Sequence, residues 1–264
     1  MDLQLQGKHV LITGGSKGIG LACARGFLQE GSRVTLLSRS QDNLDAAAKD
    51  LRAEFPSASV QTVAGDLQQA GEGARTLDAA EAAHGAVDVL VNSAGAAQRR
   101  PAPELTPQYW HDAMNAKYFT YIHMIDPVIK RMAQRGACAI VNIVGNGGKV
   151  ANPTHIAGGA ANAALMLASA GLASAYASQG VRVNAVNPGP TATDRLIKGL
   201  SATARADGIS VDEARLRSTA GIPMGRVGTP QEVANAVVFL ASSQASYITG
   251  IVLTMDGAKT AMVV

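Results

Sequence analysis

The sequence predicts an α/β fold in which a seven-stranded parallel sheet is covered by helices on both faces. Short β-branched runs alternate with longer Ala-rich segments, and the alternation continues through all 264 residues. Such alternation is typical of a doubly wound parallel sheet with crossover helices. Neither a linker nor a low-complexity block interrupts the chain. Since α/β folds reach this length as one unit, we expect a single domain over 1–264.

Strands are expected where apolar runs are short, and helices where Ala-rich segments follow capping or breaking residues. In chain order the expected strands are 9–13, 33–38, 60–63, 87–92, 139–144, 182–187 and 250–254. The expected helices are 18–29, 41–54, 68–84, 107–134, 158–179 and 230–242. The segment 190–228 is polar and interrupted by Gly and Pro, with a helical pattern only around 211–217, so we expect a substrate lid there.

Charge and composition exclude several classes of protein. The formal net charge is +3 and no basic run is longer than Arg99–Arg100, so no nucleic-acid partner is expected. Cys23 and Cys138 fit buried apolar positions better than a disulfide or a metal site, which favours a reducing, cytoplasmic location. No segment has 18 uninterrupted apolar residues and the N-terminus lacks a signal-peptide pattern, so we expect a soluble protein without membrane contact.

The stretch VLITGGSKGIGLACARGF joins an expected strand to an expected helix through a glycine-rich turn. Gly14 and Gly18 allow a tight turn and close approach of a ligand to the backbone, and Gly20 allows the helix to pack on the sheet. The helix N-terminus then presents its N–H groups to phosphate. A glycine cluster by itself also fits an ordinary strand-to-helix turn, so the choice between this turn and a phosphate-binding loop depends on the other motifs.

Further motifs occur in a fixed order along nearly the whole chain. They are GDL at 65–67, NSAG at 92–95, MNAKYF at 114–119, VNAVNPGPTATD at 183–194 and PMGRVGTPQEVANAVVFLASSQASYITG at 223–250. Together with TGGSKGIG at 13–20, this set resembles the classical branch of the short-chain dehydrogenase/reductase (SDR) family. The resemblance implies a Rossmann-type fold, a nicotinamide dinucleotide cofactor, and hydride transfer to or from a small-molecule substrate.

The resemblance also implies cofactor contacts for individual residues. Asp66 and Leu67 would lie beside the adenine, Asn92, Ala94 and Gly95 would line its ribose and the sheet edge, and 188–193 would enclose the nicotinamide carboxamide. Turn formation at strand ends is the alternative for Asn92 and Asp66. The full set of expected contacts is Gly14, Ser16, Lys17, Gly18, Ile19, Gly20, Ser38, Arg39, Asp66, Leu67, Asn92, Ala94, Gly95, Asn162, Pro188, Gly189, Thr191 and Thr193.

Charge at the end of the second expected strand selects between the two nicotinamide cofactors. NAD sites place an acid there to bind the ribose 2′-OH, whereas the 2′-phosphate of NADP needs cations. Here Ser38 takes the position of the acid, Arg39 follows it, and Lys17 lies in the glycine loop. Two cations can converge on a phosphate, so NADP(H) is expected and NAD(H) is less favoured. The alternative is that both are solvated surface charges.

The acid–base residues of the family are missing from the positions where the resemblance places them. The family uses a tyrosine whose pKa is lowered by a nearby lysine, a serine on the fifth strand, and an asparagine in the fourth helix. Aligning ANAAL at 161–165 with the SKAAL of the family puts Gly158 at the tyrosine position, Asn162 at the lysine position and Gly145 at the serine position. Only Asn115 matches, and His155 is the nearest titratable group.

Three functions remain open. We favour an atypical NADP(H)-dependent oxidoreductase that acts on an activated acceptor such as an iminium, a quinone or a polarised enone, with His155 as candidate acid. The others are an isomerase, dehydratase or lyase on the same frame, and a catalytically silent protein that binds nucleotide or a partner subunit. For His155 a turn or capping role is the alternative, while Ala96, Asn146 and Pro190 are expected to face the substrate beside it.

The two long expected helices predict self-association. Segments 107–134 and 158–179 carry apolar or small residues on more than one face, so a surface beyond the sheet-facing stripe should be buried. The family resemblance implies pairing of these helices across two-fold axes. A homodimer or homotetramer is therefore expected.

Overall fold

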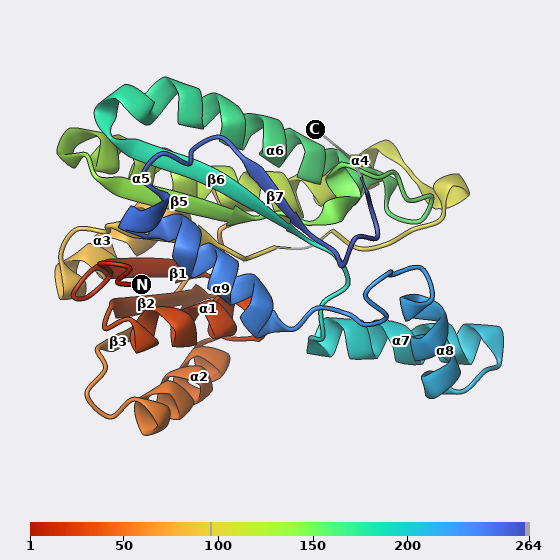
Figure 1. The fold of residues 1–264 in the computed structure, drawn as a ribbon. Coiled ribbons are helices and arrows are strands. Elements are labelled where there is room, and N and C mark those ends of the chain that lie inside the picture. The colour runs from red at the N-terminus through yellow and green to blue at the C-terminus, as the bar shows by residue number, and fades with distance from the viewer. Residues whose placement is uncertain (96, 262–264) are drawn as a thin grey trace.

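A single parallel sheet organises the protein (Figure 1). The computed structural model describes residues 1–95 and 97–261. Its strands are β1 (His9–Thr13), β2 (Arg33–Ser38), β3 (Val60–Ala64), β4 (Val89–Asn92), β5 (Cys138–Ile143), β6 (Val181–Pro188) and β7 (Val252–Met255). They follow the order β3-β2-β1-β4-β5-β6-β7, and all neighbours are parallel. The expected Rossmann-type sheet of seven strands is confirmed.

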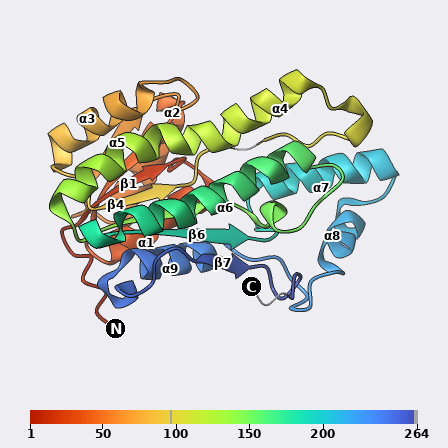
Figure 2. The same cartoon turned by 90° about the horizontal axis from the view of Figure 1, so that it is seen from above.

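Helices cover both faces of the sheet and form two apolar cores (Figures 1 and 2). One core lies under α1 (Gly18–Gln29), α2 (Gln41–Glu54) and α9 (Pro230–Ala241). The other lies under α3 (Glu72–His84), α5 (Thr120–Arg135) and α6 (Ile156–Tyr176). Because both faces are covered, β1 and β5 are buried along their whole length.

Local capping explains several helix boundaries. The Ser40 hydroxyl accepts a hydrogen bond from the Asn43 N–H at 3.3 Å and begins α2 at the expected residue. Thr229 and Glu232 form a reciprocal capping box that begins α9. The expected helix 68–84 begins later, at Glu72, because Gly71 adopts a φ of +89° that does not continue a helix.

The expected single helix over 107–134 was wrong. It is divided into α4 (Pro107–Met114), a π-helical turn η2 (Asn115–Phe119) and α5. The Thr120 hydroxyl donates to the Asn115 carbonyl at 3.0 Å within this turn. A π turn holds one residue more than an α turn, so it changes the direction in which successive side chains point. Asn115 and Thr120 consequently line a cavity while Lys117 is buried.

A proline brings α3 and α5 into backbone contact. Pro127 lies inside α5 and has no N–H to donate to the His123 carbonyl one turn earlier. Gly73 of α3 packs on that carbonyl so closely that a Cβ at position 73 would overlap the His123 oxygen. A glycine is therefore required at this crossing.

The segment 190–228 contains more helix than the sequence predicts. It forms α7 (Asp194–Asp207) and α8 (Val211–Thr219), which extend beyond the carboxyl end of β6 (Figure 1). Only α8 corresponds to the expected helical pattern. The prediction that the rest of this segment lacks a helix was wrong, because α7 is present. Gly199 interrupts the pattern within α7, and Gly208, with φ +64°, ends it. Whether this segment closes as a lid stays a prediction.

One described helix is long and apolar enough to cross a membrane by length and composition alone. It is Ile156–Gln179, which comprises α6 and the short turn that follows it. Residues of α6 pack in the second apolar core, against β6 and the other helices of that face. Packing on the sheet is the usual position of a core helix of this composition.

Candidate active site

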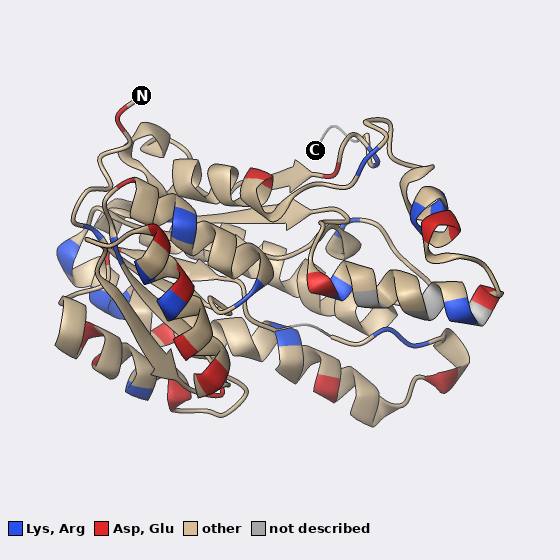
Figure 3. Ribbon diagram, turned by 90° about the horizontal axis from the view of Figure 1, so that it is seen from below, with Lys and Arg blue, Asp and Glu red and all other residues tan. Residues whose placement is uncertain are grey.

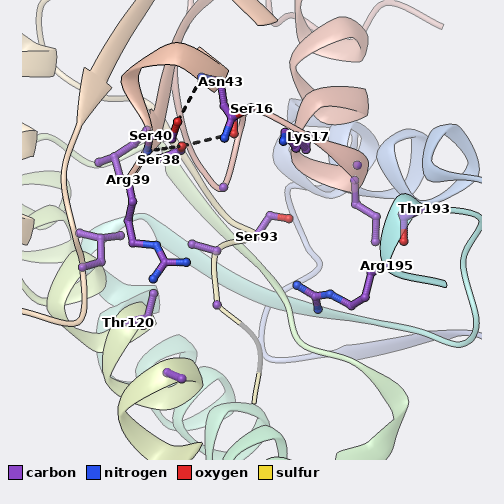
Figure 4. A pocket seen from close by; sticks show the side chains of 18 of the residues that line it. Ser16, Lys17, Ser38, Arg39, Ser40, Asn43, Ser93, Thr120, Thr193 and Arg195 are labelled. Carbon is purple, nitrogen blue, oxygen red and sulfur yellow. Dashed lines mark hydrogen bonds between the residues drawn. The ribbon is translucent and has the colours of Figure 1, made fainter. Parts of the chain in front are cut away.

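A cavity of about 1070 Å³ opens at the carboxyl ends of β1 and β4 (Figure 4). The strand order reverses between these two strands, which is where open α/β sheets form their ligand crevice. The glycine loop, the end of β2, the 65–68 turn, the end of β4, the start of α4 and the start of α7 line the cavity.

The glycine loop forms a cradle without side chains. Gly14 has a φ of +66°, and a Cβ there would lie 2.9 Å from the Ala94 backbone nitrogen. A Cβ at Gly20 would overlap the Gly14 carbonyl, so the first turn of α1 lies directly on the loop. Lys17, the residue before α1, gives no side-chain cap to the N–H groups of the helix. The helix N-terminus thus fits a phosphate.

Three cationic side chains face this cradle from different elements. Lys17 belongs to the loop, Arg39 follows β2, and Arg195 lies in the first turn of α7, with the guanidinium groups of both arginines pointing into the cavity (Figure 4). No ion pair joins any of the three to another residue that the structure describes. Elsewhere the two signs of charge are interspersed along the ribbon (Figure 3). The lining also contains Asp66, Asp112 and Asp194, so it is the three cations around the glycine loop, and not the cavity as a whole, that suit negatively charged groups of a ligand.

Hydrogen bonds between buried side chains tie the strand ends beneath the cavity. The Thr13 hydroxyl donates to Asn92 Oδ1 at 3.3 Å and accepts from the N–H groups of Ser93 and Ala94. Asn92 Nδ2 donates to Asn142 Oδ1 at 3.0 Å, and Asn142 Nδ2 donates to Ser169 at 2.9 Å. Asn92 is fully buried, so its side chain supports the site and does not line it.

The structure brings most of the expected cofactor contacts together. The cavity lining includes Gly14, Ser16, Lys17, Gly18, Ile19, Ser38, Arg39, Asp66, Leu67, Ala94, Gly95, Thr193 and the expected catalytic residue Asn115. The lining does not include Gly20, Asn92, Asn162, Pro188, Gly189, Thr191 or His155. Asn146 donates to Asp256 and Thr260, at 2.9 Å each. Ala96 lies outside the described residues.

His155 lies directly on Gly158. As the residue before α6, His155 stands three positions ahead of Gly158, and an N-cap side chain reaches that far. A Cβ at Gly158 would overlap His155 Cε1 and would lie 2.6 Å from Nε2, so the imidazole occupies the space of any side chain at position 158. The Nδ1 atom is buried with no partner among the described residues. Burial first, and the charges of Arg99 and Lys117 second, lower the pKa of His155.

Gly145 and Asn162 face each other beside this histidine. Gly145 follows β5 with a φ of +123°, a backbone conformation that strains any other residue. Asn162 Nδ2 donates a weak hydrogen bond to the Gly145 carbonyl at 3.4 Å. Asn162 is 6% exposed, so its amide is held inside the protein.

Sequence reasoning missed a buried amine behind the cavity wall. Lys117 Nζ donates to the Tyr121 hydroxyl at 2.8 Å and to the Ile143 carbonyl at 3.1 Å. Burial lowers the pKa of Lys117 to about 7, with Arg195 as a smaller cause. Burial raises the pKa of Tyr121, so this phenol stays neutral. The only sequence signal was a lysine and a tyrosine four residues apart after Asn115, a spacing that exposed helix faces also have.

Fold and cavity together define a nucleotide-binding α/β protein. A family model described as enoyl-(acyl carrier protein) reductase matches residues 14–258. Galactitol 2-dehydrogenase (L-tagatose-forming) from Cereibacter sphaeroides is 36% identical over 260 residues, covering 97% of this chain and 96% of the relative. The chain belongs to the short-chain dehydrogenase/reductase family.

Two solved structures are similar over nearly the whole chain. L-sorbose reductase from Gluconobacter frateurii, complexed with NADPH and L-sorbose, has a TM-score of 0.94 at 29% identity and covers all of both chains. An NADPH-bound short-chain oxidoreductase from Pseudomonas aeruginosa, described as containing an atypical catalytic center, has a TM-score of 0.85 at 28% identity. That likeness covers 97% of this chain and 98% of the other.

Proposed function

We propose that this protein is an NADP(H)-dependent oxidoreductase that reduces an activated small-molecule acceptor without the tyrosine and lysine of its family. One observation carries the proposal: the His155 imidazole fills the space of a side chain at Gly158. Neither residue lines the cavity, whose glycine loop and cations fit a phosphorylated nucleotide. In this proposal Gly145, Gly158 and Asn162 stand at the serine, tyrosine and lysine positions of the family.

The residues of the cavity fit NADP(H). The uncapped N-terminus of α1 and the glycine cradle suit the pyrophosphate, while Lys17 and Arg39 suit the 2′-phosphate. Ser38 accepts from Ser16 at 3.3 Å and brings no negative charge to this end of β2. NADPH-bound structures among the similar proteins support the same cofactor.

The bound cofactor would supply a hydride, so the protein has to orient the acceptor and provide one proton. His155 is the proposed donor, because it is the nearest titratable side chain to Gly158 and its ring is half-buried, with Nδ1 buried and making no hydrogen bond to the described residues. Burial lowers the pKa of His155, so the protonated ring is a stronger acid than free histidine but is the minor form at neutral pH. A positioned general acid contributes about 10² to 10⁴ in rate, so an acceptor of ordinary reactivity reacts poorly if this donor is weaker than tyrosine.

Nicotinamide absorbance with quinone, enone and iminium acceptors tests the proposal. We expect oxidation of NADPH with at least one of these acceptors and no measurable reduction of simple ketones. His155→Ala should then lower kcat by about 10² and leave NADPH affinity unchanged. Rapid ketone reduction by the unmodified protein would contradict the proposed site. Nucleotide binding without any turnover would favour the catalytically silent alternative.

We also propose a homodimer or homotetramer, a single domain with a lid over 190–228, and a cytoplasmic location. On α6, Leu167 is 77% exposed, and Phe119 in the π turn is 42% exposed, so apolar surface remains on the two long helical segments. Both Cys23 and Cys138 are buried free thiols, which suits a reducing compartment. Light scattering at micromolar protein tests the assembly, and a monomer would contradict it.

A further inference from the structure

Lys117 lies immediately behind the wall of the nucleotide cavity. Its chain neighbours Asn115, Ala116 and Thr120 line the cavity. Gly95, another lining residue, packs so tightly that a Cβ there would lie 3.5 Å from the Lys117 Cα and would overlap the Ala116 carbonyl. The Lys117 backbone therefore packs directly on a residue that lines the cavity, while its ammonium group lies on Tyr121 and Ile143.

The ammonium group of Lys117 is held by neutral groups. Tyr121 from α5 and the Ile143 carbonyl from β5 take two of its N–H groups. No ion pair joins Lys117 to a carboxylate in the described part of the chain. A lysine buried without a counter-charge is costly in its charged form, so a small change in nearby charge shifts its protonation.

The other charged groups around Lys117 come from several elements. From α7, the cavity-lining Arg195 disfavours the charged amine. At the start of α6, the pKa of His155 is lowered in part by Lys117 itself. The side chains of His111 and Asp112 on α4 are exposed. Among these groups, Arg195 is the charge that acts on the Lys117 amine.

Tyr121 is not a relocated copy of the acid used by the family. Its side chain is fully buried, and its hydroxyl both accepts from Lys117 and donates to the Ile143 carbonyl. A phenol in this position has its proton engaged by a main-chain oxygen. Lys117 is the member of the pair that titrates.

We propose that Lys117 is the proton-storing amine of this site, releasing a proton when a positively charged oxidised nicotinamide occupies the cavity and keeping it when the neutral reduced form does. This inference rests on the proposed nucleotide site. During reduction the acceptor carbon takes the hydride, the electron pair of its double bond moves to the heteroatom, and that heteroatom takes one proton. In the proposed function His155 gives that proton, and the proton that Lys117 releases replaces it on His155, so the protein takes up no net proton in this step.

The pH dependence of nucleotide binding tests this inference without a substrate. Dissociation constants for NADP⁺ and NADPH are measured by calorimetry between about pH 6 and pH 8.5, which spans the range where such an amine titrates. Neutral Lys117 repels the oxidised nicotinamide less, so the ratio Kd(NADP⁺)/Kd(NADPH) should fall as pH rises. The limit is about tenfold for each unit by which NADP⁺ lowers the pKa of Lys117. Titration of the shared 2′-phosphate cancels in this ratio.

Variants assign the effect to Lys117. In Lys117→Met the ratio should be independent of pH. In Lys117→Arg it should also be flat but higher, because arginine keeps its charge throughout this range. Tyr121→Phe removes one acceptor of the ammonium group, so the midpoint of the pH dependence of the ratio should move to lower pH. This variant keeps the test decisive if Lys117→Met does not fold.

The outcomes separate the two proposals. A flat ratio in the unmodified protein, with both nucleotides bound, overturns the inference and leaves the proposed function intact. A pH dependence that survives in Lys117→Met assigns the titration to another group, such as His155, and also overturns it. Failure to bind either nucleotide overturns the proposed function and this inference together.

Discussion

Arg39 provides the sharpest test of the nucleotide site. The residue directly follows β2, is exposed, and points its guanidinium into the cavity (Figure 4). A hydrogen bond to a charged group contributes about 1.5–3 kcal/mol, and solvent exposure favours the lower end of that range. Since about 1.4 kcal/mol corresponds to a tenfold change in affinity, Arg39→Ala should weaken NADPH binding by about tenfold. NADH lacks the 2′-phosphate, so its affinity should not change.

Arg39→Asp should reverse the preference between the two cofactors. The new carboxylate repels the 2′-phosphate and can accept a hydrogen bond from the ribose 2′-OH of NADH. Fluorescence titration at fixed ionic strength measures both affinities. Arg33→Ala is the matched control, because Arg33 begins the same strand at the opposite edge of the sheet and donates to the Gly7 carbonyl. Tighter binding of NADH than of NADPH by the unmodified protein would refute the reasoning.

Three further predictions concern packing and protonation. Gly73→Ala should destabilise the fold by about 1–3 kcal/mol in urea unfolding, because the new methyl overlaps the α5 backbone, whereas Gly199→Ala, with nothing within 4 Å, should not. Burial lowers the pKa of His9, so at acidic pH the unfolded chain binds a proton that the folded protein does not. The free energy of unfolding should therefore fall as pH drops below about 6.5. His9→Gln should remove the His9 contribution to this pH dependence. Gly158→Ala should displace the His155 ring toward solvent and raise its pKa in an NMR titration, and an unchanged value would place the ring elsewhere.

The sequence predicted the first half of the fold closely. The bounds of β1, α1, β2 and α2 agree with expectation, because the glycine loop ends at Gly18, where α1 begins, and the Ser40 cap precedes α2. The division of 107–134 was not predictable from apolar periodicity, since the π turn adds one residue without adding a breaker. The helix α7 was missed because Gly199 and a polar composition resemble a loop.

The candidate site was predicted in composition and not in geometry. The glycines and cations at the strand ends predicted a ligand cavity there, since the order of the motifs places them at one edge of the sheet. The seating of His155 on Gly158 depends on a ring orientation that spacing alone does not specify. The burial of Lys117 depends on the π turn, which apolar periodicity did not indicate.

The π turn also bears on how such a site can change by mutation. Each residue of an α-helix turns the following side chains by about 100°. Loss of a single codon within Asn115–Phe119 would therefore regularise the helix and carry Tyr121 away from the Ile143 carbonyl. Because the sheet pairing of β4 and β5 does not involve this turn, such a deletion alters the interior amine without changing strand topology. A one-residue indel is thus a short evolutionary route between a site that stores a proton and one that does not.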